Sequence, residues 1–131
     1  MNIHSSAEDY LECILILQNR IGRVRSIDIA KELDYSKPSV SIAMKRLREN
    51  GYIMVDEDGF ISLLPSGRKI AENMYGRHVL LTELFSRLGV SKQTAVEDAC
   101  RVEHVISQES YEKILRFMTK LQREEHTDNG N

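Results

Sequence analysis

The sequence predicts a mostly α-helical fold, in which an N-terminal winged helix-turn-helix is followed by an α-helical domain. Two short helical segments separated by a tight turn at residues 34–36 predict the helix-turn-helix, and a pair of strand-like segments directly after them predicts the wing. From Pro65 onward, apolar residues recur at helical spacing without a further strand pattern. We therefore expect one domain over residues 1–64 and another over residues 65–131, with a polar tail from about residue 124.

The bulk composition limits the class of protein. With 131 residues, of which 41% are hydrophobic, the chain can bury the core of one compact domain or of two small ones. No stretch approaches the roughly 18 unbroken apolar residues of a membrane span. A signal peptide needs an apolar segment near the N-terminus, where this chain instead has the polar residues Asn2, His4, Ser5 and Ser6. We therefore expect a cytoplasmic protein with no membrane partner.

Charge and cysteine content narrow the class further. A formal net charge of -2 is not typical of a nucleic-acid-binding protein, so any DNA site must be local. Cys13 and Cys100 are too few and too far apart for a secreted disulfide scaffold. Each cysteine is therefore either a small buried hydrophobic residue or a metal ligand.

Capping residues predict the first two helices. Ser5 or Ser6 opens a helix with acidic residues in its first turn, and Gly22 ends it. Ser26 caps a short second helix over residues 27–33.

A tight turn leads from the second helix to the third. Pro38 is favoured at the first position of a helix, and this third helix is expected to reach Asn50 and to stop at Gly51. In a helix-turn-helix, the second helix of the pair enters the major groove of DNA.

The segments after the third helix have the pattern of a hairpin. Residues 52–55 and 60–63 are rich in strand-forming side chains, and Asp56–Gly59 between them has the composition of a tight turn. Because this hairpin directly follows a helix-turn-helix, it predicts a wing.

The second half of the chain predicts three helices, the first of them long and amphipathic. Their expected boundaries are Pro65 to Leu88, Ser91 to about Ile106, and Ser107 to near Arg123. Their apolar residues exceed what a small monomer could bury, which predicts a homodimerisation domain. The residues concerned are Leu80, Leu81, Leu84, Phe85, Val102, Val105, Ile114, Leu115, Phe117, Met118 and Leu121.

The outward face of the third helix is the predicted DNA-binding surface. Helical spacing turns inward the residues Val40, Ala43, Met44 and Leu47. The opposite face carries hydroxyls suited to phosphates or base edges, basic groups suited to phosphates or guanine, and an isoleucine suited to thymine methyl groups. A single Lys or Arg could equally be a solvated surface residue, but an exposed Ile42 has no such explanation. The predicted DNA contacts are Arg25, Lys37, Pro38, Ser39, Ser41, Ile42, Lys45 and Arg46.

A second constellation has the chemistry of a metal site. Cys100, Glu103 and His104 occupy positions i, i+3 and i+4 of one predicted helix, which places a thiolate, a carboxylate and an imidazole within reach of one ion. Asp9 and Glu12 are spaced i, i+3 on the otherwise apolar first helix, where a cation would compensate two acids beside a buried face.

Each of these assignments has a structural alternative. Asp9 could simply support the N-terminus of its helix, and Glu12 could point to solvent. His78 stands alone in the middle of the long helix, where most histidines are not ligands. Cys13 is four residues after Asp9 and could face the same site, although a buried thiol is the simpler interpretation.

Several segments carry a resemblance to one family. They are residues 7–12 (AEDYLE), 36–41 (SKPSVS), 59–63 (GFISL), 67–71 (GRKIA), Arg77–His78 and, as the most specific segment, 97–107 (EDACRVEHVIS). Together they span nearly the whole chain. On these residues the sequence resembles metal-dependent repressors of the diphtheria toxin repressor and manganese transport regulator type.

The resemblance implies a set of metal ligands and a hybrid site. Five residues match manganese-binding positions of the manganese regulators, namely Asp9, Glu12, His78, Glu103 and His104. Those regulators have a glutamate in place of Cys100, whereas the iron-type repressors have a cysteine there and a methionine in place of Asp9. Oxygen ligands favour manganese, while a thiolate favours softer ions. The expected cofactor is therefore Mn(II) or Fe(II), with Co(II) or Zn(II) also possible. The chain resembles the short form of the family, without the C-terminal SH3-like domain.

The expected function is that of a metal-responsive repressor of metal-uptake genes. A twofold dimer would place two recognition helices on a palindromic operator in double-stranded DNA, and metal held between the two domains would favour the DNA-binding arrangement. A winged-helix regulator that does not respond to metal is the main alternative. We expect no enzyme and no small organic substrate, because the sequence has no nucleophile elbow or oxyanion-hole loop.

Overall fold

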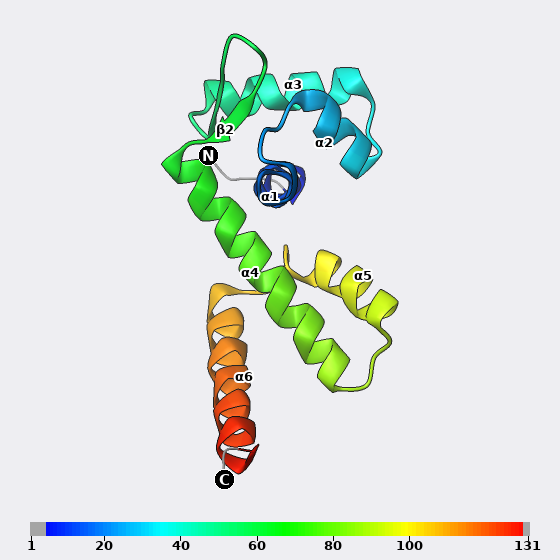
Figure 1. Cartoon of the computed structure of the whole chain (residues 1–131), viewed down its shortest axis with the longest axis vertical. Helices are drawn as coiled ribbons and strands as arrows, with labels where there is room; N and C mark the ends of the chain where they lie inside the picture. Colours follow the sequence, from blue (N-terminus) through cyan, green and yellow to red (C-terminus); the bar gives the residue numbers. More distant parts are fainter. Residues whose placement is uncertain (1–4, 130–131) are drawn as a thin grey trace. The chain divides into compact units, whose positions relative to one another are not determined.

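The computed structural model describes residues 5–129, which form two compact units, the first ending at Tyr75 and the second beginning at Gly76. Figure 1 shows the elements in chain order. They are α1 (Ser5–Ile21), α2 (Ser26–Leu33), α3 (Lys37–Glu49), β1 (Ile53–Val55), β2 (Ile61–Leu63), α4 (Pro65–Arg87), α5 (Lys92–Val102) and α6 (Gln108–Asn129). The mostly α-helical winged helix-turn-helix fold is confirmed. In the part of the chain described, none of the helices is long and apolar enough to cross a membrane.

The helix-turn-helix is formed by α2, α3 and a turn at Asp34. Asp34 adopts a left-handed conformation with φ of 56°, which ends α2 and reverses the chain. Ser36 is the N-cap of α3, because its hydroxyl accepts a hydrogen bond from the Ser39 N–H at 3.3 Å. Pro38 lies one position later than predicted, since Lys37 is the first residue of α3.

The predicted cap of α2 is wrong. Ser26 is the first residue of the helix, and the N-cap is Arg25. The backbone N–H of Arg25 donates to the Asp28 carboxylate at 2.9 Å, so the third residue of the helix satisfies the cap from within.

The wing is a short antiparallel hairpin with one additional bridge. β1 pairs with β2 in the register Ile53↔Leu63, Met54↔Ser62 and Val55↔Ile61. Val24, in the segment before α2, forms an isolated bridge with Ile61, whose N–H donates to the Val24 carbonyl at 2.7 Å. Ile53, Ile61 and Val24 are all buried, so this side of the hairpin closes the core of the first unit.

Helix α1 provides the centre of that core. Leu11 and Ile14 of α1 are completely buried together with Ile29 of α2 and Val40 of α3. The first turn of α4 completes this unit at Gly67, where any Cβ would collide with the backbone carbonyl of Tyr52, so the close approach requires glycine.

In the second unit, the C-terminal half of α4 and α6 lie side by side in the same direction. The Gln122 amide of α6 donates to Glu83 of α4 at 2.8 Å, and Arg87 of α4 forms a bidentate pair with Glu125 of α6. The expected end of the last helix near Arg123 is wrong, since the polar segment that follows remains helical to Asn129.

Candidate metal centre and DNA-binding face

Three side chains of the second unit converge. His78 comes from α4, Cys100 from α5, and Glu103 from the turn directly after α5. His78 Nδ1 lies 3.2 Å from Glu103 Oε2 and 3.7 Å from Cys100 Sγ. One ligand atom from each residue lies within 4.8 Å of the other two, which is close enough for all three to bind one ion.

The carboxylate of Glu103 is the most buried part of this group. The residue is only 1% exposed, and among the described residues its Oε2 has no hydrogen bond apart from the 3.2 Å contact with His78 Nδ1, which is an ion pair if the imidazole is protonated. A buried carboxylate with so few partners is costly, and a coordinated cation would compensate it. The observed imidazole, thiol and carboxylate therefore fit a divalent transition metal.

His104 extends the same group. Its Nε2 lies 3.6 Å from Glu103 Oε1, and its side chain is 11% exposed. The predicted association of Cys100, Glu103 and His104 is thus partly observed. Helix α5 ends at Val102, but the C-cap Glu103 keeps a helical backbone conformation, so its spacing from Cys100 is as predicted, whereas His104 lies in the turn beyond the helix.

Arg77 explains how this turn is held. Its guanidinium is buried and donates to the carbonyls of Glu103 at 3.1 Å and Ile106 at 2.6 Å, and to Gln108 Oε1 at 2.9 Å. These carbonyls lie at and beyond the end of α5, where they have no donor partner within the helix, so Arg77 caps the turn that carries Glu103 and His104. The sequence offered one signal for this role, because Arg77 is three residues after Met74 and shares its apolar helix face.

The two acids of α1 belong to the first unit. Glu12 is 7% exposed, so the interpretation that it points to solvent is wrong, and Asp9 is partly buried. Their role as metal ligands remains a prediction.

Cys13 behaves as a core residue. It is 4% exposed, and burial raises the pKa of its thiol to about 12, with a smaller contribution from the negative charge of Glu32. A thiol held in its protonated form is a poor metal ligand. The structure therefore favours the buried-thiol interpretation.

The predicted DNA contacts on α3 lie on its exposed face. Val40, Met44 and Leu47 are buried as expected, while Ile42 is 55% exposed. Solvent also reaches Lys37, Pro38, Ser39, Ser41, Lys45 and Arg46. The helix therefore presents the mixture of hydroxyl, basic and apolar groups that base and phosphate recognition requires. Their contact with DNA remains a prediction.

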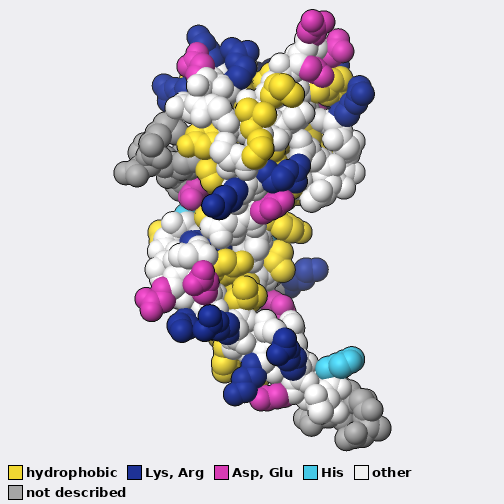
Figure 2. All heavy atoms as spheres, turned by 90° about the vertical axis from the view of Figure 1, so that its left-hand side faces the viewer, with side chains coloured by type: hydrophobic (Ala, Val, Ile, Leu, Met, Phe, Trp, Pro, Cys, Tyr) yellow, Lys and Arg dark blue, Asp and Glu magenta, His cyan; other side chains and the backbone are white. Residues whose placement is uncertain are grey.

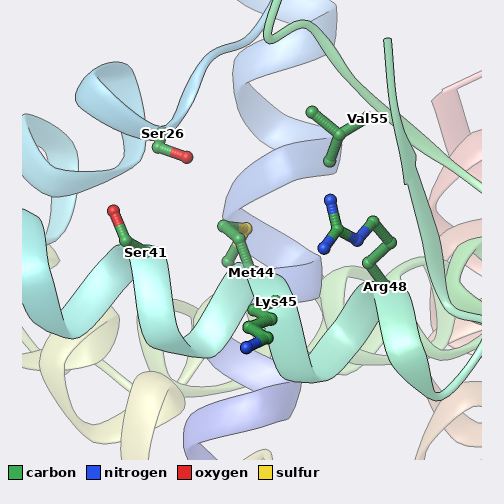
Figure 3. Close-up of a pocket in the computed structure, with 6 residues that line it drawn as sticks. All are labelled: Ser26, Ser41, Met44, Lys45, Arg48 and Val55. Carbon is green, nitrogen blue, oxygen red and sulfur yellow. The ribbon is translucent and has the colours of Figure 1, made fainter.

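A hollow of about 260 Å³ separates α3 from the wing. Figure 3 shows Arg48 extending from α3 toward Val55 of β1, whereas the Lys45 side chain points away from Val55. A neighbouring hollow of about 280 Å³ shares Ser26 and Ser41 with the first. Arg48 is absent from the predicted contacts, although its place one turn beyond Lys45 on a basic helix was a usable signal.

The fold and the site together define a DNA-binding regulator with a metal-binding second domain. Residues 2–59 match the family described as iron dependent repressor, N-terminal DNA binding domain, and residues 64–130 match its metal binding and dimerisation domain. The chain belongs to this family of iron-dependent repressors, which includes the predicted diphtheria toxin repressor and manganese regulator type.

Named relatives agree with this assignment. The transcriptional regulator MntR of Salmonella typhimurium is 36% identical over 110 residues, covering 84% of this chain and 70% of the relative. The HTH-type transcriptional regulator MntR of Geobacillus kaustophilus is 32% identical over 120 residues, covering 92% of this chain and 85% of the relative.

A solved structure shares the fold. The structure described as a manganese-dependent transcriptional repressor in complex with manganese superimposes with a TM-score of 0.74 at 29% identity, over 82% of this chain. The present chain spans 50% of the length of that solved chain.

Proposed function

We propose that the chain is a metal-activated repressor that binds a palindromic operator as a homodimer and controls metal-uptake genes. The observation that carries this proposal is the convergence of His78, Cys100 and Glu103 in the second unit of a chain whose first unit is a winged helix-turn-helix. Regulators named MntR among the relatives, and a family description that includes metal binding and dimerisation, support it.

The donor atoms indicate which metals are suitable. When bound, the ion would supply a positive charge and fixed coordination geometry at the buried end of the group. His78 would bind through Nδ1, Glu103 through a carboxylate oxygen, and Cys100 as a thiolate. The manganese-bound neighbour favours Mn(II) and the family description favours Fe(II), whereas the thiolate also permits Co(II) or Zn(II).

We propose that His104, Asp9 and Glu12 complete the ligand set. The two acids come from α1 of the DNA-binding unit, so ligands from both units would make metal affinity depend on their arrangement. Metal would then shift the equilibrium toward the DNA-binding arrangement by as much as it binds that arrangement more tightly. Residue types and the buried state of Glu12 support this part of the proposal.

Exposed apolar side chains support dimerisation through the second unit. Leu80, Leu81 and Met118, which were expected in the dimer surface, are already buried within the chain. Three other residues of the expected set, Val105, Leu115 and Phe117, remain exposed together with Val79 and Leu88, with exposed fractions between 43% and 81%. Apolar side chains in this number fit the interface of a homodimer.

The relatives are transcriptional regulators. We therefore infer that the chain acts on DNA in the cytoplasm without catalysing a reaction.

The decisive experiment compares DNA binding with and without metal. Duplexes selected from a random library in the presence of Mn(II) would be titrated by fluorescence anisotropy with Mn(II), Fe(II), Co(II), Zn(II) or EDTA. The wild type should bind at least tenfold more tightly with its metal, since coupling free energies between sites are about 1–3 kcal/mol. Equal binding in EDTA would show that the regulator does not respond to metal.

A matched pair of variants tests the site. Glu103→Gln removes the buried anionic oxygen with little change of shape and should abolish metal activation. Glu97→Gln makes the same chemical change on the exposed surface of α5 and should leave activation intact. Thermal unfolding without metal would establish that both variants are folded. Wild-type activation in Glu103→Gln would contradict the assignment of the site.

A further inference from the structure

We propose that Arg23, Arg25 and Phe60 form a phosphate-binding site at the base of the wing, through which the wing contacts the DNA backbone. The acidic tip of the wing stays away from the DNA. This inference rests on the proposed DNA-binding function and adds two residues, Arg23 and Phe60, to its predicted contacts.

The register of the hairpin brings the three side chains together. Val24 and Ile61 form an antiparallel bridge and are both buried. Because side chains alternate between the faces of a strand, the neighbours of this pair project from the opposite face. The antiparallel register places Arg25 directly across from Phe60. The guanidinium carbon of Arg25 lies 4.2 Å from the centre of the Phe60 ring, and that of Arg23 lies 4.9 Å from it.

The two cation–π contacts leave both arginines able to bind phosphate. A guanidinium held over a ring by the cation–π attraction still has N–H groups that can donate to an anion. Neither Arg23 nor Arg25 forms an ion pair with an acid in the described part of the chain. The nearby Arg20 differs, because Glu32 binds it through two contacts of 2.8 and 3.0 Å. Of these three arginines, Arg23 and Arg25 are therefore available to DNA, whereas Arg20 is paired.

The tip of the wing has the opposite charge. It carries Asp56, Glu57 and Asp58 in succession, all exposed. Asp56 is held by the turn, since its carboxylate accepts hydrogen bonds from the N–H groups of Asp58 and Phe60, both at 2.9 Å. Figure 2 shows acidic side chains gathered at the top of the molecule, where the wing lies. Phosphates would repel this tip and be attracted to the base of the same hairpin.

The base of the wing also adjoins the predicted DNA face. Ser26, the residue after Arg25, lines the hollow shared with Ser41, Lys45 and Arg48 of α3. A duplex seated along α3 would therefore have its backbone close to the segment that carries the two arginines. In this arrangement α3 reads bases, while the arginines position the backbone.

The test uses non-specific DNA, because phosphate contacts do not depend on sequence. A fluorescein-labelled mixed-sequence duplex of about 30 base pairs, long enough for two half-sites, is titrated with the Mn(II)-loaded protein between about 50 and 200 mM KCl. Arg23→Gln and Arg25→Gln should each reduce the slope of log K against log salt by about 1.8, because the dimer loses one phosphate contact in each protomer. Arg20→Gln removes the same charge from an arginine already bound by Glu32 and should leave the slope unchanged.

Phe60 is tested as a positioning residue. Phe60→Leu keeps both positive charges, so the slope should persist while affinity falls about two- to fivefold, the equivalent of one exposed cation–π contact. Phe60→Tyr keeps the ring and should restore affinity. Equal thermal unfolding of the two variants would show that the loss arises at the DNA surface.

The outcomes separate this inference from the function on which it rests. If the wild type binds no duplex with any of the four metals, the proposed function fails. If the wild type binds with a normal salt slope and both arginine variants retain that slope, the phosphate site is wrong. If Glu57→Lys steepens the slope by about one phosphate contact per protomer, the tip lies on the backbone and the proposed placement of the wing is overturned.

Discussion

The two units hold their functional side chains in opposite ways. In the second unit, the candidate ligands converge around Glu103, which is 1% exposed and fixed by the hydrogen bonds of Arg77 to the adjoining turn. In the first unit, the candidate DNA contacts lie along one exposed face of α3, where Ile42 is 55% exposed. A metal site requires convergence and little water, whereas a DNA-binding face requires side chains that solvent can reach.

Because of this difference, substitutions in the two units should affect stability and binding in different proportions. Substitutions around Glu103 should change both the folding of the second unit and its metal affinity, because buried polar groups lose partners. Substitutions on the outer face of α3 should change DNA binding with little effect on folding.

The two cysteines give the largest contrast, one in each unit. Cys13 is buried and the pKa of its thiol is raised to about 12, whereas Cys100 is exposed and contacts His78. At pH 8 the thiolate fraction of Cys13 should be about a thousandfold below that of a thiol with an ordinary pKa. Iodoacetamide should therefore label Cys100 readily and Cys13 only after unfolding. Mass spectrometry of Cys13→Ala and Cys100→Ala variants would assign the two rates.

The labelling of Cys100 also tests metal binding. Bound metal should protect Cys100 from labelling, and lack of protection by every metal tested would remove Cys100 from the ligand set.

The stability of the first unit should depend on pH through Cys13. The unfolded Cys13 thiol releases its proton near its ordinary pKa of 9.0, whereas the folded thiol keeps its proton to a pKa of about 12. The contribution of Cys13 to the free energy of unfolding is therefore complete below pH 9 and is lost as the pH rises from 9 toward 12.

Arg77→Ala should have the next largest effect. It leaves the carbonyls of Glu103 and Ile106 without their buried donor, which should lower the free energy of unfolding by about 3 kcal/mol. Because the same turn carries Glu103 and His104, metal affinity should fall as well. Urea unfolding and metal titration by calorimetry measure the two effects separately.

Arg87→Ala is the control for Arg77. Arg87 also lies on α4 and forms a bidentate pair with Glu125, but this pair is exposed to solvent. Its loss should scarcely change stability and should leave metal affinity intact. If Arg77→Ala behaves like Arg87→Ala, the turn does not depend on the buried arginine.

Most of the fold could be predicted from local signals. The turn at Asp34, Pro38 near the start of α3 and the acidic hairpin turn all act within a few residues, so they identified the winged helix-turn-helix. The turn after α5 could not be predicted in this way, because its carbonyls are bound by Arg77, an arginine from another helix.

The candidate site was predicted in part for a related reason. Helical spacing correctly associated Cys100 with Glu103, but it could not bring in His78, which lies 22 residues before Cys100 and was suggested by family resemblance alone. Phe60 was noticed only as a strand residue, because its partners Arg23 and Arg25 are reached through the bridge of Val24 to Ile61. Spacing reveals neighbours on one element, while contacts between elements depend on the fold.

Cys100→Glu tests how the site selects its metal. The substitution replaces the thiolate with a carboxylate, the ligand that the manganese-type relatives have by resemblance, and keeps a negative donor. Affinity for Zn(II) and Co(II) should fall about tenfold or more relative to Mn(II), because hard oxygen donors suit Mn(II) better. Cys13→Ser, a similar loss of sulfur in the other unit, should leave the order of metal affinities unchanged. Equal preference in wild type and Cys100→Glu would show that the thiolate does not bind the ion.

Ile42→Ala should have the smallest effect and tests the exposed face of α3. Because Ile42 is 55% exposed, the free energy of unfolding should change by no more than about 0.5 kcal/mol. Binding to a selected operator should weaken about fourfold per lost apolar contact, the equivalent of burying one methylene against a thymine methyl group. Replacing each operator thymine with deoxyuridine removes that methyl group. At the contacted position, the replacement should weaken the wild type but not Ile42→Ala, and such non-additivity locates the contact. Additive losses at every thymine would place Ile42 away from the bases, leaving α3 to bind chiefly through its polar and basic side chains.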